Sequence, residues 1–234
     1  MSMDNDISKI GPRADIEKMD SKIARFIDHT LLKPEATQEQ VEKLCEEAKK
    51  FDFATVCVNP GYVSLAAGFL KSSNIGVCAV VGFPLGATTS NIKAIEAKEA
   101  INNGATEIDM VINIGALKSK NYKLLLNDIK EVRETTQGHI LKTILETGLL
   151  TEDEIVKACQ LAKEAGADFV KTSTGFGPGG ATVKIVKLMH QTVGPNMKVK
   201  ASGGIRTRRK AWAMIKAGAS RIGTSSGVAI VTGK

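Results

Sequence analysis

Two lysines lie near the ends of predicted β-strands that are separated by one helix. Lys171 and Lys200 each follow apolar strand residues and precede a glycine turn, at Gly175 and at Gly203. An ammonium group in a buried parallel strand is costly to desolvate, so these positions favour chemistry over structure. A second cation and partial burial both lower the pKa of a lysine, which makes its amine a nucleophile. The pair predicts a lysine nucleophile; the alternative is two strand-end side chains that reach solvent.

A third predicted strand, over residues 107–112, carries Asp109. Asp109 is two residues from Glu107 and two from Val111, so the three side chains point to the same face of the strand. A carboxylate among apolar neighbours is either the salt-bridge partner of an interior lysine or a proton shuttle, and the two lysines favour the shuttle. A neutral lysine amine forms a Schiff base with a carbonyl, and the protonated imine acidifies the adjacent carbon. This constellation predicts carbon–carbon bond chemistry with neither a metal nor an organic cofactor.

Short apolar runs alternate with amphipathic stretches along the chain. Strands are expected at 27–32, 54–58, 76–81, 107–112, 140–145, around 171, around 200 and at 221–223. Helices are expected from about 21 to 26, after 37–40, after 59–60, and over 90–102, 121–136, 151–165, 181–192 and 207–217. Eight βα units in one domain predict an α/β fold, a single (β/α)8 TIM barrel with a short N-terminal helix. The barrel is expected over residues 21–234, after a polar N-terminal extension over 1–20.

The charge of the 234-residue chain is distributed unevenly. The net charge is +7, and residues 169–234 hold twelve Lys and Arg but no Asp or Glu. Such a segment suits nucleic acid, a membrane surface or a phosphorylated small molecule. Only 4% of residues are aromatic, which disfavours stacking on single-stranded nucleic acid, and no stretch is long enough to span a bilayer. We therefore expect a phosphorylated small-molecule substrate, with no nucleic-acid or membrane partner.

The four cysteines are scattered, with no Cys-x-x-Cys pair. This pattern is typical of a reduced, cytoplasmic protein without a metal site. Cys57, near a predicted strand end, is interpreted as a buried structural thiol; the alternative is a thiol that lines a pocket.

Glycine turns follow the last three predicted strands. Those at Gly203-Gly204 and Gly223 present free backbone N–H groups, and the loops after strands seven and eight are the usual phosphate site of such barrels. The turn over residues 175–180 also satisfies the Gly-x-Gly-x-x-Gly pattern of dinucleotide-binding folds. Such a fold needs an acidic residue about twenty positions later, and none exists downstream. A phosphate site is therefore favoured over a dinucleotide site.

Six motifs, in order, resemble those of the deoxyribose-phosphate aldolase family from about residue 21 onward. They are Ile27-Asp28-His29-Thr30-Leu31-Leu32-Lys33-Pro34, Val56-Cys57-Val58-Asn59-Pro60, Val81-Gly82-Phe83-Pro84-Leu85-Gly86, Glu107-Ile108-Asp109-Met110-Val111-Ile112-Asn113, Lys171-Thr172-Ser173-Thr174-Gly175-Phe176 and Lys200-Ala201-Ser202-Gly203-Gly204-Ile205-Arg206.

The resemblance implies a cytoplasmic class I aldolase of deoxyribonucleotide and carbohydrate catabolism. It would reversibly cleave 2-deoxy-D-ribose 5-phosphate to acetaldehyde and D-glyceraldehyde 3-phosphate, as a homodimer or homotetramer. Lys171 would form the Schiff base, Lys200 would perturb its pKa and transfer protons, and Asp109 would donate and accept protons. Asp28 would lie near a substrate hydroxyl. The substrate phosphate would contact Gly175, Gly203, Gly204, Gly223, Ser225 and Ser226.

Two other functions are compatible with the same residues. The first is another Schiff-base aldolase or transaldolase acting on a different phosphosugar. The second, from a different class, is a basic barrel that binds phosphosugars or nucleic acid without chemistry. Borohydride trapping and product analysis discriminate between them, since only a Schiff-base enzyme gains a covalent adduct.

Overall fold

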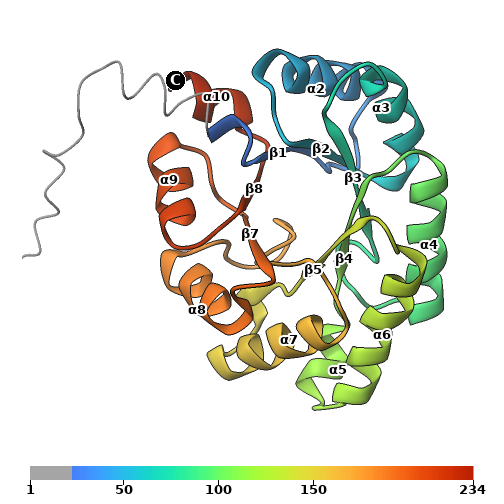
Figure 1. Ribbon diagram of the computed structural model, residues 1–234, viewed down its shortest axis with the longest axis vertical. Helices are drawn as coiled ribbons and strands as arrows, with labels where there is room; N and C mark the ends of the chain where they lie inside the picture. Colours follow the sequence, from blue (N-terminus) through green and yellow to red (C-terminus); the bar gives the residue numbers. More distant parts are fainter. Residues whose placement is uncertain (1–22, 234) are drawn as a thin grey trace, which may run out of the picture.

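A closed barrel of eight parallel strands forms the centre of the computed structural model, which describes residues 23–233 (Figure 1). The strands are β1 (Ile27–Leu31), β2 (Thr55–Val58), β3 (Gly76–Val81), β4 (Glu107–Val111), β5 (Ile140–Ile144), β6 (Phe169–Lys171), β7 (Lys198–Ser202) and β8 (Arg221–Thr224). Each strand pairs with its neighbour in sequence, and β8 pairs with β1 to close the barrel. The predicted (β/α)8 fold is confirmed.

Helices surround the barrel and connect its strands (Figure 1). The α-helices are α2 (Gln38–Phe51), α3 (Val63–Leu70), α4 (Ser90–Asn102), α5 (Ile114–Lys118), α6 (Tyr122–Thr135), α7 (Glu152–Glu164), α8 (Val183–Val193), α9 (Arg208–Lys216) and α10 (Gly227–Thr232). Two short 3₁₀ helices, η1 (Pro60–Tyr62) and η2 (Thr147–Leu149), complete the set in the described part of the chain. The prediction missed α5 and α10, which are too short for a helical repeat to show in their sequences.

Local sequence signals explain where several helices begin and end. Thr37 and Thr151 form the capping boxes expected at the starts of α2 and α7, with Gln40 and Glu154 as the reciprocal partners. After α4, Gly104 has a φ of 103°, a conformation that glycine adopts without strain. The expected N-terminal helix is helical at its described residues 23 and 24, and the extension over 1–20 lies outside the described residues.

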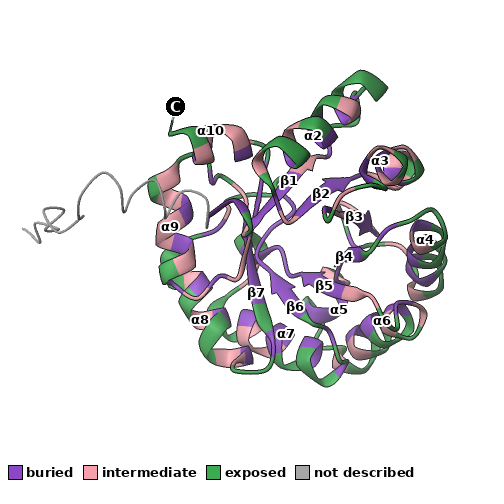
Figure 2. Cartoon of the chain, turned by 45° about the horizontal axis from the view of Figure 1, so that its top comes forward, coloured by how far each residue is buried: buried purple, intermediate pink, exposed green. Residues whose placement is uncertain are grey.

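The two faces of each strand meet different environments. Outward side chains such as Ile108, Met110 and Val170 pack in the main core between the barrel and its helices. Figure 2 shows this buried layer, with exposed residues on the outer faces of the helices. The inward face of β4 instead carries Glu107 and Asp109, which alternate with the apolar residues as predicted. The barrel interior therefore contains charged groups, which must be paired to be stable there.

Candidate active site

Lys171 and Lys200 meet on one carboxylate oxygen in the barrel interior. The two lysines are opposite each other in the register of β6 and β7. Each Nζ donates to Asp109 Oδ2, at 2.8 Å in both cases. Asp109 and Lys200 are fully buried and Lys171 is 2% exposed. The structure thus brings together the three residues that the sequence singled out for catalysis.

A third lysine, which the sequence-based reasoning missed, completes the contacts of Asp109. Lys142, opposite Asp109 in the register of β4 and β5, donates to Asp109 Oδ1 at 2.8 Å. Its Nζ also lies 2.5 Å from Glu107 Oε2. A lysine in an apolar strand was the signal that identified Lys171, and the run Leu141-Lys142-Thr143 carries the same signal.

Asp28 is buried in the barrel interior, next to Lys200. Its carboxylate is fully buried and lies 2.5 Å from Lys200 Nζ and 2.5 Å from an Arg221 guanidinium nitrogen. Arg221 also pairs with Glu107 at 2.8 Å. Asp28 therefore contacts the catalytic candidates through Lys200. Its predicted place near a substrate hydroxyl stays a prediction.

These ion pairs shift the ionisation of the buried groups in opposite directions. Burial alone would raise the pKa of Asp109, but the ammonium groups of Lys142, Lys171 and Lys200 hold it well below its ordinary value. Burial alone would lower the pKa values of Lys142 and Lys200, but Asp109 raises both, with help from Asp28. In the resting site Asp109 is consequently a carboxylate, and Lys142 and Lys200 are ammonium groups.

A cavity of about 380 Å³ opens above this network at the C-terminal ends of the strands. Lys171 borders it, as do five of the predicted phosphate-binding residues: Gly175, Gly203, Gly204, Gly223 and Ser225. Ser226 lies next to this lining, with its backbone N–H donating to Thr224 Oγ1 at 3.0 Å. Two basic side chains that the sequence analysis did not assign, Lys33 and Arg206, also line the cavity.

Close backbone contact holds two of the glycine turns together. Gly203 has a φ of 90°, and a Cβ there would lie 2.9 Å from Gly180 Cα. A side chain at position 203 would therefore both strain the backbone and separate the turn after β6 from the turn after β7.

Glu146, at the end of β5, holds the turn that follows Lys171. Its buried Oε2 accepts hydrogen bonds from the backbone N–H of Thr174, at 3.2 Å, and from the Thr174 hydroxyl. Thr174 Oγ1 in turn accepts from the backbone N–H groups of Phe176 and Gly177, at 3.0 and 3.3 Å. The chain of bonds fixes residues 174–177, three of which line the cavity.

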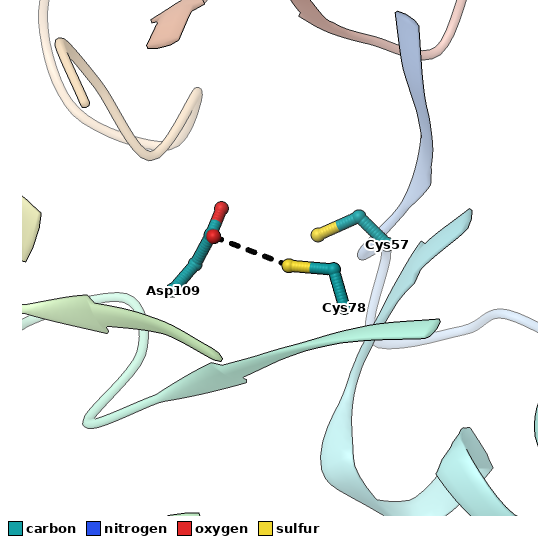
Figure 3. Close-up of side chains that lie close together, drawn as sticks. All are labelled: Cys57, Cys78 and Asp109. Atoms are coloured by element: carbon teal, nitrogen blue, oxygen red, sulfur yellow. Dashed lines mark hydrogen bonds between the residues drawn. The ribbon is translucent and has the colours of Figure 1, made fainter. Parts of the chain in front are cut away.

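One group of described residues has the donor atoms of a metal site. The Sγ atoms of Cys57 and Cys78 and a carboxylate oxygen of Asp109 lie within 4.8 Å of one another, and Figure 3 shows both thiols and the carboxylate converging. The oxygens of Asp109 already accept from three ammonium groups, whose charge opposes a cation. The group therefore fits a metal ion poorly. Cys57 itself is fully buried, as the sequence-based interpretation favoured.

Comparisons with known proteins identify the family of the chain. The family model described as DeoC/LacD family aldolase matches residues 22–233. A deoxyribose-phosphate aldolase of Streptococcus sanguinis is 62% identical over 213 residues, which cover 91% of this chain and 97% of that protein. A deoxyribose-phosphate aldolase of a Geobacillus species is 60% identical over 217 residues, 92% of this chain and 97% of that protein.

Solved structures show the same fold. The tetrameric deoxyribose phosphate aldolase of Aeropyrum pernix superposes with a TM-score of 0.86 at 32% identity, covering 95% of this chain and 97% of that one. An aldolase named QR15 superposes with a TM-score of 0.87 at 43% identity, covering 90% and 95%. With a buried lysine–aspartate–lysine cluster beneath a glycine-lined cavity, and with these relatives along nearly its whole length, the chain belongs to the DeoC/LacD family of aldolases.

Proposed function

We propose that this aldolase works through a Schiff base on Lys171. The reaction is the reversible aldol cleavage of 2-deoxy-D-ribose 5-phosphate to acetaldehyde and D-glyceraldehyde 3-phosphate, the activity for which its relatives are named. The observation that carries the proposal is the pair of 2.8 Å contacts from Lys171 and Lys200 to Asp109 Oδ2, directly beneath the cavity.

The proposed reaction starts with a neutral Lys171 amine. Lys200 is an ammonium because Asp109 and Asp28 raise its pKa. The Lys171 amine attacks the C1 aldehyde carbon of the open-chain sugar to give a carbinolamine, which loses water to form a protonated imine. Of the three lysines on Asp109, Lys171 is the one that borders the cavity, which supports its role as the nucleophile.

Carbon–carbon cleavage follows from the imine. When the C3 hydroxyl loses its proton, the C2–C3 bond breaks. The electron pair of that bond moves onto the protonated imine, which gives an enamine and D-glyceraldehyde 3-phosphate. Protonation of the enamine carbon and hydrolysis of the imine release acetaldehyde and restore the amine. We assign the proton transfers to Lys200 and Asp109, since the shared oxygen connects Lys200 with Lys171 by two hydrogen bonds.

The phosphate of the substrate is proposed to lie against the glycine turns on the cavity wall. Gly175, Gly203, Gly204, Gly223, Ser225 and Ser226 are the candidates for direct contact, as the sequence motifs imply. Backbone N–H groups at helix starts favour anions, and the cationic side chains of Lys33 and Arg206 line the same cavity. Asp28, buried beneath Lys200, is proposed to act on the substrate hydroxyl through that lysine.

Sodium borohydride reduction in the presence of acetaldehyde tests the mechanism. We expect one ethyl group on the peptide that contains Lys171, no adduct in Lys171→Ala, and an unchanged adduct in the control Lys187→Ala, which alters an exposed lysine of α8. An adduct on another lysine, or normal turnover in Lys171→Ala, would contradict the proposal. Acetaldehyde released from deoxyribose 5-phosphate distinguishes this activity from that of another phosphosugar aldolase or a transaldolase.

Assembly and cellular location are further parts of the proposal. We propose a homodimer or homotetramer, supported by the tetrameric relative from Aeropyrum pernix. Light scattering coupled to size-exclusion chromatography measures this directly. A cytoplasmic role in deoxyribonucleotide breakdown is supported by four cysteines that are all free and buried. No helix in the described part of the chain is long and apolar enough to cross a membrane.

A further inference from the structure

Two cysteines of neighbouring strands face each other beside the catalytic candidates. Cys57 of β2 and Cys78 of β3 are directly opposite in the parallel register, and both side chains are fully buried in the barrel interior (Figure 3). Neighbouring strands lie about 4.8 Å apart. This spacing falls inside the Cα–Cα range of about 4.4–6.8 Å that disulfides show, and the two Sγ atoms lie within 4.8 Å of each other.

The same pair is connected to Asp109 and close to the substrate cavity. The Cys78 thiol donates to Asp109 Oδ1 at 3.1 Å, and Lys142 Nζ lies 3.5 Å from the Cys78 sulfur. Leu32 belongs to the same apolar cluster as both cysteines and also lines the cavity. A small oxidant in the cavity is therefore separated from the thiols by one side-chain layer.

We propose that Cys57 and Cys78 are an oxidation site, at which hydrogen peroxide forms a reversible disulfide that slows the aldolase. The Cys57 thiolate attacks one peroxide oxygen and the O–O bond breaks. The departing hydroxide takes up the proton that Cys57 released, so a sulfenic acid and one water result. The Cys78 sulfur then attacks the Cys57 sulfur and displaces hydroxide, which takes up the Cys78 proton to become the second water. Two thiols and one peroxide thus give one disulfide and two waters.

The chemistry of the two thiols supports this order of steps. The neighbouring Cys78 thiol lowers the pKa of Cys57, and the charges of Lys200 and Lys171 lower it further, against the opposing effects of burial and of Asp109. Burial raises the pKa of Cys78 well above its ordinary value, so Cys78 remains the protonated partner. The two other cysteines differ: burial raises the pKa of Cys45 to about 11 and that of Cys159 to about 12.

Disulfide formation changes the contacts of Asp109. The two sulfur atoms must approach to about 2.05 Å, and the oxidised Cys78 has no S–H to donate. Asp109 Oδ1 then retains Lys142 as its partner, and the carboxylate that positions Lys171 and Lys200 loses one of its hydrogen bonds. We expect turnover to fall about tenfold, the factor typical of one lost hydrogen bond to a charged group. The activity part of this inference rests on the proposed function.

The experiment treats the purified, reduced protein with hydrogen peroxide and follows both mass and aldolase activity. We expect the intact mass to fall by two hydrogens and a Cys57–Cys78 linked peptide to appear. Turnover should fall about tenfold and return with dithiothreitol. The variants Cys57→Ala and Cys78→Ala, each compared with its own untreated activity, should show no dithiothreitol-reversible loss. The matched controls Cys45→Ala and Cys159→Ala should respond like the parent.

Several outcomes would overturn the inference. A parent protein that loses activity without the linked peptide, or a linked peptide with unchanged turnover, contradicts it. The same reversible loss in Cys57→Ala and Cys78→Ala also contradicts it. Borohydride trapping on the reduced protein separates the two proposals, because a missing adduct there refutes the Schiff-base mechanism while the linked peptide is read independently of activity.

Discussion

Replacing Lys142 by methionine removes one charge from the centre of the ion-pair network and keeps a side chain of similar length. Lys142 Nζ lies 2.8 Å from Asp109 Oδ1 and 2.5 Å from Glu107 Oε2, and its side chain is fully buried. In Lys142→Met, the hydrogen-bond donor that Asp109 Oδ1 retains among the described residues is the weak Cys78 thiol. Glu107 retains Arg221.

Removal of one partner of a buried ion pair leaves an uncompensated charge in a medium of low polarity. Such changes cost about 3–5 kcal/mol of the free energy of unfolding. Since domains are stable by about 5–15 kcal/mol in total, Lys142→Met should remain folded but much closer to its unfolding transition. Loss of the ammonium should also raise the pKa of Asp109, since Lys142 is the largest of the three charges that lower it.

Urea unfolding followed by circular dichroism measures the free energy, and the acid limb of the kcat profile against pH measures the effect on Asp109. We expect a midpoint shifted to lower urea and an acid limb shifted to higher pH. The control is Lys98→Met, at an exposed position of α4, which should change stability by less than about 0.5 kcal/mol. Equal unfolding free energies for the two variants would refute the reasoning.

Two further predictions test other parts of the site. The charges of Lys200 and Arg221 outweigh burial and lower the pKa of Asp28 to about 2, below its ordinary 3.8. As the pH falls, the Asp28 carboxylate is therefore protonated in the unfolded chain before it is protonated in the folded chain. The stabilisation that Asp28 contributes is present above about pH 4 and is lost as the pH falls to 2. Asp28→Asn should therefore flatten the fall in unfolding free energy over this range by about 2 kcal/mol, and an unchanged slope would argue against it. Glu146→Gln weakens the charge-assisted bonds to Thr174, so steady-state kinetics should show KM for deoxyribose 5-phosphate rising several-fold with a smaller change in kcat. A fall in kcat at constant KM, or the same effect in the exposed control Glu164→Gln, would count against this positioning role.

Sequence patterns predicted the barrel well because its local rules are strong. The alternation along residues 107–112 separated the charged inward face from the apolar outward face, and the capping box at Thr37 located the start of α2. Helix α4 was predicted with its observed bounds. These signals depend on neighbours within about four residues, so they can be recognised without knowledge of the tertiary fold.

The site was only partly predictable because its contacts depend on the stagger of the strands. Arg221 pairs with Asp28, which lies 193 positions earlier, and this contact requires β8 to close against β1. No local pattern identifies such a pair. The contact of Cys78 with Asp109 likewise depends on the register of β3 and β4. Lys142 is a different case, since a lysine in the apolar run around Leu141 is a local signal that the sequence alone provides.

The ion-pair network inside the barrel has an uneven count of charges. Its described members are three carboxylates, those of Asp28, Glu107 and Asp109, and four basic side chains: Lys142, Lys171, Lys200 and Arg221. Loss of one proton leaves equal numbers of positive and negative groups, whereas loss of a second would leave a buried carboxylate uncompensated. Carboxylates hold the pKa values of Lys142, Lys200 and Arg221 above their ordinary ranges. The network is therefore electroneutral when one of its lysines is an amine, which is the charge state that the proposed Lys171 nucleophile requires.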